Sequence, residues 1–212
     1  PTMGPTVSPE PPTVAPTVPP TQPSPTPAPT TESEEAEAAL AQHNVYRCMH
    51  GVQLLVWDTN VAAKAQEWAD THTGIHSTWQ YRTTDDGYYG ENWASEEISE
   101  NAPLFQGTTL VEHVADWYSE IERCDGPNGY GTTLKVRNDA GQPVGHYTQV
   151  VWSTTTRLGC GKSWAAILYP QAPERGYVNS TWYVCMYAEG GNEPGLFESK
   201  VLSPTKTEVE CQ

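Results

Sequence analysis

The sequence has little positive charge. Its 212 residues include 11 Lys and Arg against 26 Asp and Glu, so the formal net charge at pH 7 is −15. Proteins that bind nucleic acid neutralise its phosphates with clustered Lys and Arg. The charge balance therefore excludes a nucleic-acid-binding protein, and it disfavours binding to extended anionic surfaces.

The sequence also lacks a long hydrophobic run. No stretch approaches eighteen apolar residues, so we expect no transmembrane segment. The chain begins at Pro1 rather than at Met, and we expect that a secretion signal has been removed. These features predict a secreted protein, extracellular or at the cell surface.

Residues 1–38 contain no Lys, Arg, aromatic residue or Cys, and they hold twelve of the nineteen prolines beside eight Thr. Such a segment cannot bury enough apolar surface to offset its ordering entropy. Proline favours an extended polyproline II backbone, and Thr-rich proline tracts are typical acceptors of O-linked sugars. We therefore expect an extended arm with O-glycosylation candidates at Thr2, Thr6, Thr13, Thr17, Thr21, Thr26 and Thr30.

The five cysteines contain no Cys-x-x-Cys pair, which excludes zinc-finger and thioredoxin spacings. Asn179-Ser180-Thr181 is an N-glycosylation sequon, and with the Pro/Thr arm it favours an extracellular compartment that permits disulfides. An odd number leaves one cysteine as a thiol or bonded to another chain.

Residues 39–212 are long enough for one domain with a substantial core. Periodicity and capping residues predict helices over 34–50, 58–71 and 109–123. Residues rich in β-formers predict strands over 145–152, 158–168 and 177–187, with irregular loops over 77–105 and 125–144. This order indicates a layered α+β domain.

Two polar residues are predicted on apolar faces. Glu120 shares a helix face with Trp117 and Ile121, where an unpaired carboxylate would be costly. His146 alternates with Thr148 and other residues on one face of the predicted strand 145–152. Together they suggest a shared polar cavity.

Several motifs in a fixed order resemble the CAP superfamily, which includes cysteine-rich secretory proteins, antigen-five allergens and pathogenesis-related class-one proteins. The likeness covers about residues 38–198. The motifs are Gly-His-Tyr-Thr-Gln-Val-Val-Trp at 145–152, His43-Asn44 with Arg47, Leu54-x-x-Trp57, His76-Ser77 with Gly90-Glu91-Asn92, Trp-Tyr-Ser-Glu-Ile at 117–121, and Tyr-Val-Cys-Met-Tyr at 183–187 followed by Gly191-Asn192 and Gly195.

The resemblance implies a three-layer α-β-α sandwich over residues 39–198, followed by a C-terminal tail over 199–212. It also implies a cavity lined by His76, Glu91, Glu120 and His146. The family's two histidines can bind a divalent metal, often zinc, and imidazole suits that ion. The alternative is a metal-free network in which the glutamates fix the surrounding loops, so no cofactor is strictly required.

The chain departs from the family pattern at the cavity mouth. His76 and Glu91 are fifteen residues apart, which is wider than usual, and the inserted loop carries Tyr88 and Tyr89. We expect this insertion to reshape the cavity mouth.

The resemblance also bears on the cysteines. Cys160 and Cys185 match the family's paired positions and should form a disulfide. We predict a second pair between Cys48 and Cys124, which end the first and third helices, and this leaves Cys211 as the odd cysteine.

Three functional hypotheses follow. We favour a structural subunit that assembles with copies of itself, its arm lying in an aromatic groove or on a sheet edge of the next copy to form a polymer or matrix. The alternative is a lipid-, sterol- or metal-binding module with the arm as a passive stalk. The third is a hydrolase using the His/Glu cavity, with Ser77 as the nucleophile, but no known hydrolase motif is present and we favour a non-enzymatic protein.

Overall fold

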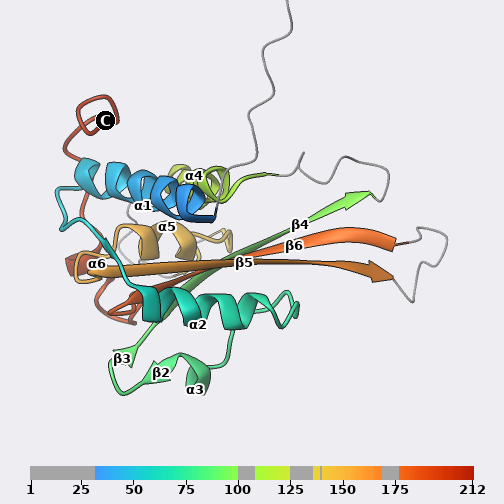
Figure 1. The fold of residues 1–212 in the computed structure, drawn as a ribbon. Helices are drawn as coiled ribbons and strands as arrows, with labels where there is room; N and C mark the ends of the chain where they lie inside the picture. Colours follow the sequence, from blue (N-terminus) through green and yellow to red (C-terminus); the bar gives the residue numbers. More distant parts are fainter. Residues whose placement is uncertain (1–31, 100–107, 125–135, 139, 169–176) are drawn as a thin grey trace, which may run out of the picture.

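The structure is a computed structural model, and it describes residues 32–99, 108–124, 136–138, 140–168 and 177–212 (Figure 1). The threonines predicted to carry O-linked sugars lie outside these residues. Helix α1 spans Glu32–Met49, so residues 32–38, which we assigned to the arm, are helical. The other helices are α2 (Thr59–Ala69), α3 (Trp79–Arg82), α4 (Leu110–Ser119), α5 (Gly145–Val150) and α6 (Phe197–Lys200), with a 3-10 turn, η1, at Glu120–Arg123.

A four-stranded sheet forms the middle layer, in the order β1 (Val56–Trp57), β5 (Arg157–Leu168), β6 (Tyr177–Ala188) and β4 (Gly90–Ser99). β1 and β5 are parallel, and the other neighbours are antiparallel. Helices α1, α4 and α5 cover one face of the sheet and α2 covers the other (Figure 1). The predicted α-β-α sandwich is confirmed.

The sheet separates two apolar cores. On β6, Tyr183, Cys185 and Tyr187 face the side of α1 and α4, whereas Val184 and Met186 face α2. Helix α2 approaches β5 closely at two glycines. A Cβ on Gly159 would lie 2.0 Å from the backbone nitrogen of Ala62, so any larger residue would push the helix away from the sheet.

Local signals at two helix starts are confirmed. The Asp58 side chain accepts hydrogen bonds from the backbone N–H groups of Asn60 and Val61 and caps α2. At α4, Thr109 and Glu112 form the reciprocal capping box that their spacing predicts.

Two assignments of secondary structure were wrong. Residues 145–150 form helix α5 rather than a strand, because tertiary contacts override the local β preference. The Glu120 carboxylate accepts hydrogen bonds from the N–H groups of His146 and Tyr147 in the first turn of this helix. Conversely, residues 90–99, which we predicted to be irregular, form strand β4 through pairing with β6 although few of them favour strands.

The disulfide prediction was half right. Cys160 and Cys185 are bonded, as the resemblance implies. Cys48 bonds with Cys211 and not with Cys124. The error arose because nothing in the sequence places the tail, which runs back along α1, where the Thr205 N–H donates to the Met49 carbonyl at 2.7 Å. The Cys124 thiol donates weakly to the Glu120 carbonyl at 3.9 Å.

Candidate functional site

His76 and Glu91 form the first of two similar pairs. His76 Nδ1 lies 2.7 Å from Glu91 Oε1. The carboxylate also accepts from the Ser77 N–H at 3.0 Å and from Ser77 Oγ at 2.5 Å. A carboxylate only accepts, so Nδ1 donates the proton of this bond and Nε2 takes no part in it.

Glu91 remains ionised at neutral pH although it is buried. Burial raises the pKa of this carboxyl, but the hydrogen bonds from His76 and Ser77 more than offset it, so the pKa lies below its usual range. Glu91 therefore orients the His76 ring as a charged acceptor.

His146 and Glu120 form the second pair. His146 Nδ1 lies 2.8 Å from Glu120 Oε1, and the other carboxylate oxygen accepts from the backbone of α5. Glu120 is only 4% exposed, as its place on an apolar helix face predicted. This pair repeats the first one on other elements, since β4 carries Glu91 whereas η1 and α5 carry Glu120 and His146.

Both histidines line one cavity of about 870 Å³. In the part of the chain that the structure describes, no hydrogen bond to either Nε2 atom occurs. Of the four predicted residues, His76, Glu91 and His146 line this cavity, and Glu120 contacts the site through its bond to His146. Further residues from several elements complete the lining, among them Trp79, Arg82, Tyr88, Asn92, Arg137, Gln149, Glu189, Asn192 and Glu193.

The donor set suits a metal ion bound by two imidazoles and solvent. Each histidine has its Nδ1 fixed by a carboxylate, which is the usual arrangement behind a metal-binding Nε2. Across the described ranges, no group of three or more His, Cys, Asp or Glu side chains is arranged to hold a metal. The imidazoles that line the cavity are those of His76 and His146, so the described residues provide at most two histidine ligands there and not a closed structural zinc site.

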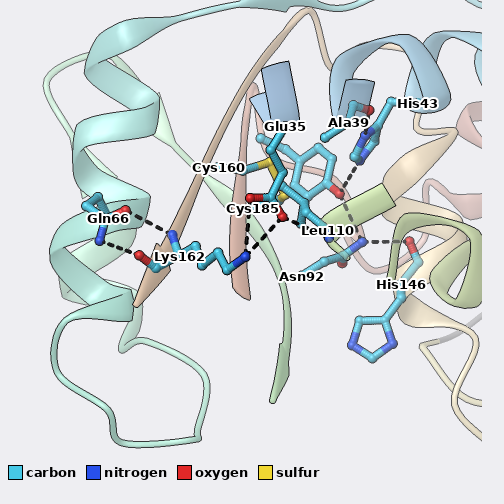
Figure 2. Close-up of a disulfide and its surroundings, with 11 residues drawn as sticks. Glu35, Ala39, His43, Gln66, Asn92, Leu110, His146, Cys160, Lys162 and Cys185 are labelled. Atoms are coloured by element: carbon cyan, nitrogen blue, oxygen red, sulfur yellow. Dashed lines mark hydrogen bonds and ion pairs between the residues drawn. A yellow bond between two sulfur atoms is a disulfide. The ribbon is translucent and has the colours of Figure 1, made fainter. Parts of the chain in front are cut away.

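A network of buried hydrogen bonds lies next to the cavity. His43 Nδ1 donates to the Ala39 carbonyl at 2.7 Å, so its Nε2 accepts from the Tyr187 hydroxyl at 2.8 Å. Asn92 Nδ2 donates both to Tyr187 and to the His146 carbonyl, each at 3.1 Å. Figure 2 shows His43, Asn92 and His146 of this network. The network ties α1 and the sheet to the start of α5.

Sequence reasoning missed most of the site's other residues. His43, Asn92 and Tyr187, which form the supporting network, lie within the motifs that carry the family resemblance, but the motifs alone gave them no role. Trp79 and Arg82 gave no signal beyond the unusual width of the loop between His76 and Glu91. The structure gives that loop a definite form, since α3 and a hairpin of β2 (Thr83–Thr84) and β3 (Gly87–Tyr88) build it.

Ser77 is not arranged as a nucleophile. Its side chain is buried, and its hydroxyl donates to Glu91 rather than to a histidine. A nucleophilic serine also needs an approach for substrate, which a buried hydroxyl lacks. This geometry does not support the hydrolase hypothesis as we framed it.

The predicted glycosylation site, Asn179, is half-buried on β6, where its backbone pairs with β4 on one side and β5 on the other. N-linked glycosylation there stays a prediction. In the segments that are described, no helix has the length and apolar character needed to cross a membrane.

Comparison with known proteins was made by family, by sequence and by fold. Residues 40–187 match the family described as "Cysteine-rich secretory protein family", CAP. Repressed by EFG1 protein 1 of Candida albicans is 32% identical over 82% of this chain, which covers 55% of that protein. Pathogenesis-related leaf protein 4 of Solanum lycopersicum is 32% identical over 74% of this chain and 78% of its own length.

Two solved structures share the fold. "Structure of BmVAL-1" has a TM-score of 0.59 at 23% identity, covering 86% of this chain and 89% of that one. "Crystal structure of NaASP2 with Zn2+" has a TM-score of 0.54 at 22% identity, covering 84% and 90%. The family match spans most of the described residues, and the relatives in this family are generally secreted proteins. The motifs and the sandwich agree with these matches, and the chain belongs to the CAP family of cysteine-rich secretory proteins.

Proposed function

We propose that this protein is a secreted binding module whose cavity takes up a divalent metal ion, with zinc the first candidate, between His76 and His146. The observation that carries the proposal is the pair of histidines in one cavity, each with Nδ1 fixed by a buried glutamate. This arrangement leaves two Nε2 atoms, the donors that zinc prefers among nitrogen ligands.

The expected affinity is modest. Two protein ligands are fewer than the three or four of catalytic and structural zinc sites. A bound metal would supply a Lewis-acid centre with open positions for water or for an oxygen of a ligand. Glu91 and Glu120 would hold the imidazoles in place rather than coordinate the ion, because their oxygens already accept from the histidines and from backbone N–H groups.

Zinc is the first metal to test because one structure of the same fold carries Zn²⁺ in its title, although at 22% identity that likeness shows the fold alone. Isothermal titration of the whole protein with zinc chloride should show one site. The double variant His76→Ala/His146→Ala should weaken it at least tenfold.

A matched control distinguishes this site from general surface binding. His72 lies outside the cavity and hydrogen-bonds with Ser163 at 2.8 Å, so His72→Ala should leave the affinity unchanged. Retained zinc affinity in the double variant, or an equal loss in the His72 variant, would contradict the proposal.

Assembly through the arm is a second candidate, because the sheet exposes aromatic side chains. Trp164 and Tyr177 are 63% and 51% exposed and lie on the same face of the β5–β6 hairpin. An extended proline-rich segment binds exposed aromatic side chains. Sedimentation of the intact protein and of a variant lacking residues 1–31 tests this, because assembly must be lost with the arm.

The hypothesis of lipid or sterol binding comes from the family resemblance, with the loop 125–144 as the expected flank of the groove. Residues 125–135 and 139 of this loop lie outside the described part. Sterol or lipid binding therefore stays a prediction.

A further inference from the structure

The insertion between His76 and Glu91 forms one wall of the cavity, and it is firmly tied to the rest of the domain. The Gly190 N–H donates to the Tyr88 carbonyl at 2.8 Å. Arg157 binds Asp86 at 2.7 Å, and within the insertion the Tyr89 N–H donates to the Arg82 carbonyl at 2.9 Å. Side chains on this wall are therefore held in fixed positions beside the cavity.

An aromatic platform stands on this wall. Trp79 and Tyr88 stack with ring centroids 4.0 Å apart and an interplanar angle of 20°. Trp79 is nevertheless 60% exposed. Since one face of the indole covers Tyr88, the other face is open at the cavity. Large exposed aromatic surfaces at a lined cavity mark ligand contacts more often than packing.

Arg82 provides a positive charge next to the platform, and at longer range this charge helps to lower the pKa of Glu91. Its guanidinium lies 5.2 Å from the centre of the Tyr88 ring, and the residue lines the cavity. Among the described residues, no carboxylate lies within ion-pair distance of it, and its buried Nε has no hydrogen-bond partner. Arg157, by contrast, is surrounded by Asp58, Asp86 and Glu189.

A buried guanidinium N–H without an acceptor loses its hydration and gains nothing in return, so the structure as it stands has an acceptor missing at this point. The acceptor that best matches a guanidinium is a planar carboxylate or a tetrahedral oxyanion. The Glu91 carboxylate, which lines the same cavity, already accepts from His76 and Ser77.

The remaining lining limits the size and charge of the ligand. Arg137 and the two histidines add donors, whereas Glu189 and Glu193 add negative charge. The chain as a whole carries −15, so a polyphosphate or another strongly anionic ligand would be repelled. The amides of Asn92, Gln149 and Asn192 also line the cavity, but each already bonds within the protein. The side chains that line the cavity are mostly polar, which suits a ligand rich in hydroxyl groups and not an aliphatic chain.

We propose that this wall of the cavity binds a sugar unit with a single anionic group. The C–H face of the pyranose ring would stack on the open face of Trp79, the carboxylate or sulfate would pair with Arg82, and the hydroxyl groups would donate to Glu189 or Glu193, which also line the cavity. The inference rests on the proposed role of the cavity in ligand binding, but it does not require the metal.

Ligand-observed NMR on the whole protein tests the proposal with a matched pair of probes, methyl glucuronide and methyl glucoside, which differ in one carboxylate. Glucose 6-sulfate serves as the sulfate probe. Titrations are made at 150 mM salt with a chelator present, so that anion binding is separated from zinc binding. We expect the glucuronide to bind at least tenfold more tightly than the neutral glucoside. The ratio between glucuronide and sulfate identifies which anion the site prefers.

Three variants assign the effect to residues. Arg82→Gln should abolish the preference for the charged probe, and Trp79→Ala should weaken all probes at least tenfold. Trp164→Ala is the matched control, because Trp164 is exposed to the same degree but lies away from the cavity. Folding of each variant is checked by thermal unfolding.

The proposal is overturned if neither anionic probe binds more tightly than the glucoside, or if Arg82→Gln keeps the preference in a folded protein. Zinc titration of the same samples keeps the two proposals apart. Loss of sugar binding with intact zinc binding refutes only the sugar site, and the reverse result refutes only the metal site.

Discussion

Replacement of Arg47 should destabilise the domain more than replacement of most apolar core residues. Arg47 is fully buried in α1, and it donates to four backbone carbonyls. Nε bonds with the Gln53 carbonyl at 2.7 Å, and the terminal nitrogens bond with those of Val150, Trp152 and Thr155 at 3.0, 2.9 and 2.7 Å. Two of these acceptors lie at and just beyond the end of α5, where a helix leaves its carbonyls without internal partners.

The magnitude follows from these contacts. Burial lowers the pKa of Arg47 to about 10, so the guanidinium is still charged at neutral pH. Arg47→Met fills a similar volume and removes the cost of burying a charge, but it leaves four carbonyls without this donor. At about 1–3 kcal/mol for each unsatisfied group, partly relieved by relaxation, we expect a net loss of about 4 kcal/mol. Arg47→Lys should cost about half as much, since one ammonium reaches fewer of the carbonyls.

These losses are measured by urea unfolding at pH 7, monitored by tryptophan fluorescence. Wild type and both variants are fitted with one shared dependence of the unfolding free energy on urea concentration. The order wild type, Arg47→Lys, Arg47→Met should hold. A loss below about 1 kcal/mol for Arg47→Met would refute the reasoning, because the carbonyls would then be satisfied without the guanidinium.

Three further predictions concern other parts of the domain. Burial lowers the pKa of His43 to about 4. Below about pH 6.5 the unfolded chain therefore binds a proton at His43 that the folded chain binds only near pH 4. The free energy of unfolding should therefore fall by about 3 kcal/mol as pH drops from above 6.5 to below 4, and His43→Gln should flatten this slope in urea titrations at several pH values. Gly190→Ala places a Cβ 2.7 Å from the Tyr88 ring and 2.5 Å from the Gly90 nitrogen. This clash should lower the melting temperature by several degrees, and an unchanged melting temperature would contradict the prediction. Cys48→Ser opens a disulfide that spans 163 residues, which loop entropy predicts to contribute about 5 kcal/mol to stability. Cys160→Ser opens the shorter loop, for which the same relation gives roughly 3.5 kcal/mol. Equal losses of unfolding free energy in the two variants would argue against the entropic account.

Local chemistry predicted much of the fold. Asp58 and the Thr109–Glu112 pair marked two helix starts because capping depends on residues close in sequence. Residues 145–150 misled the same reasoning, since two sets of hydrogen bonds outweigh their β preference. The first N–H groups of α5 donate to Glu120, and Arg47 donates to the carbonyl at the end of the helix. Such contacts join residues far apart in the chain, and no local pattern reports them.

The candidate site could likewise be predicted only in part. The place of Glu120 on an apolar helix face predicted a polar cavity before any resemblance was considered, and the resemblance supplied His76 and Glu91. Trp79 and Arg82 could not be predicted, because the insertion that carries them departs from the family pattern. The partner of Cys48 was missed for a related reason, as the path of the tail depends on packing against α1 and not on any motif.

The most direct test of the metal site is a crystal of the whole protein soaked in zinc chloride and measured on both sides of the zinc absorption edge. Our account predicts one anomalous peak in the cavity, bonded to Nε2 of His76 and Nε2 of His146, with the remaining positions taken by solvent and both glutamates still bonded to Nδ1. A cavity without an anomalous peak at a saturating zinc concentration, or a peak bound by other residues, would contradict it.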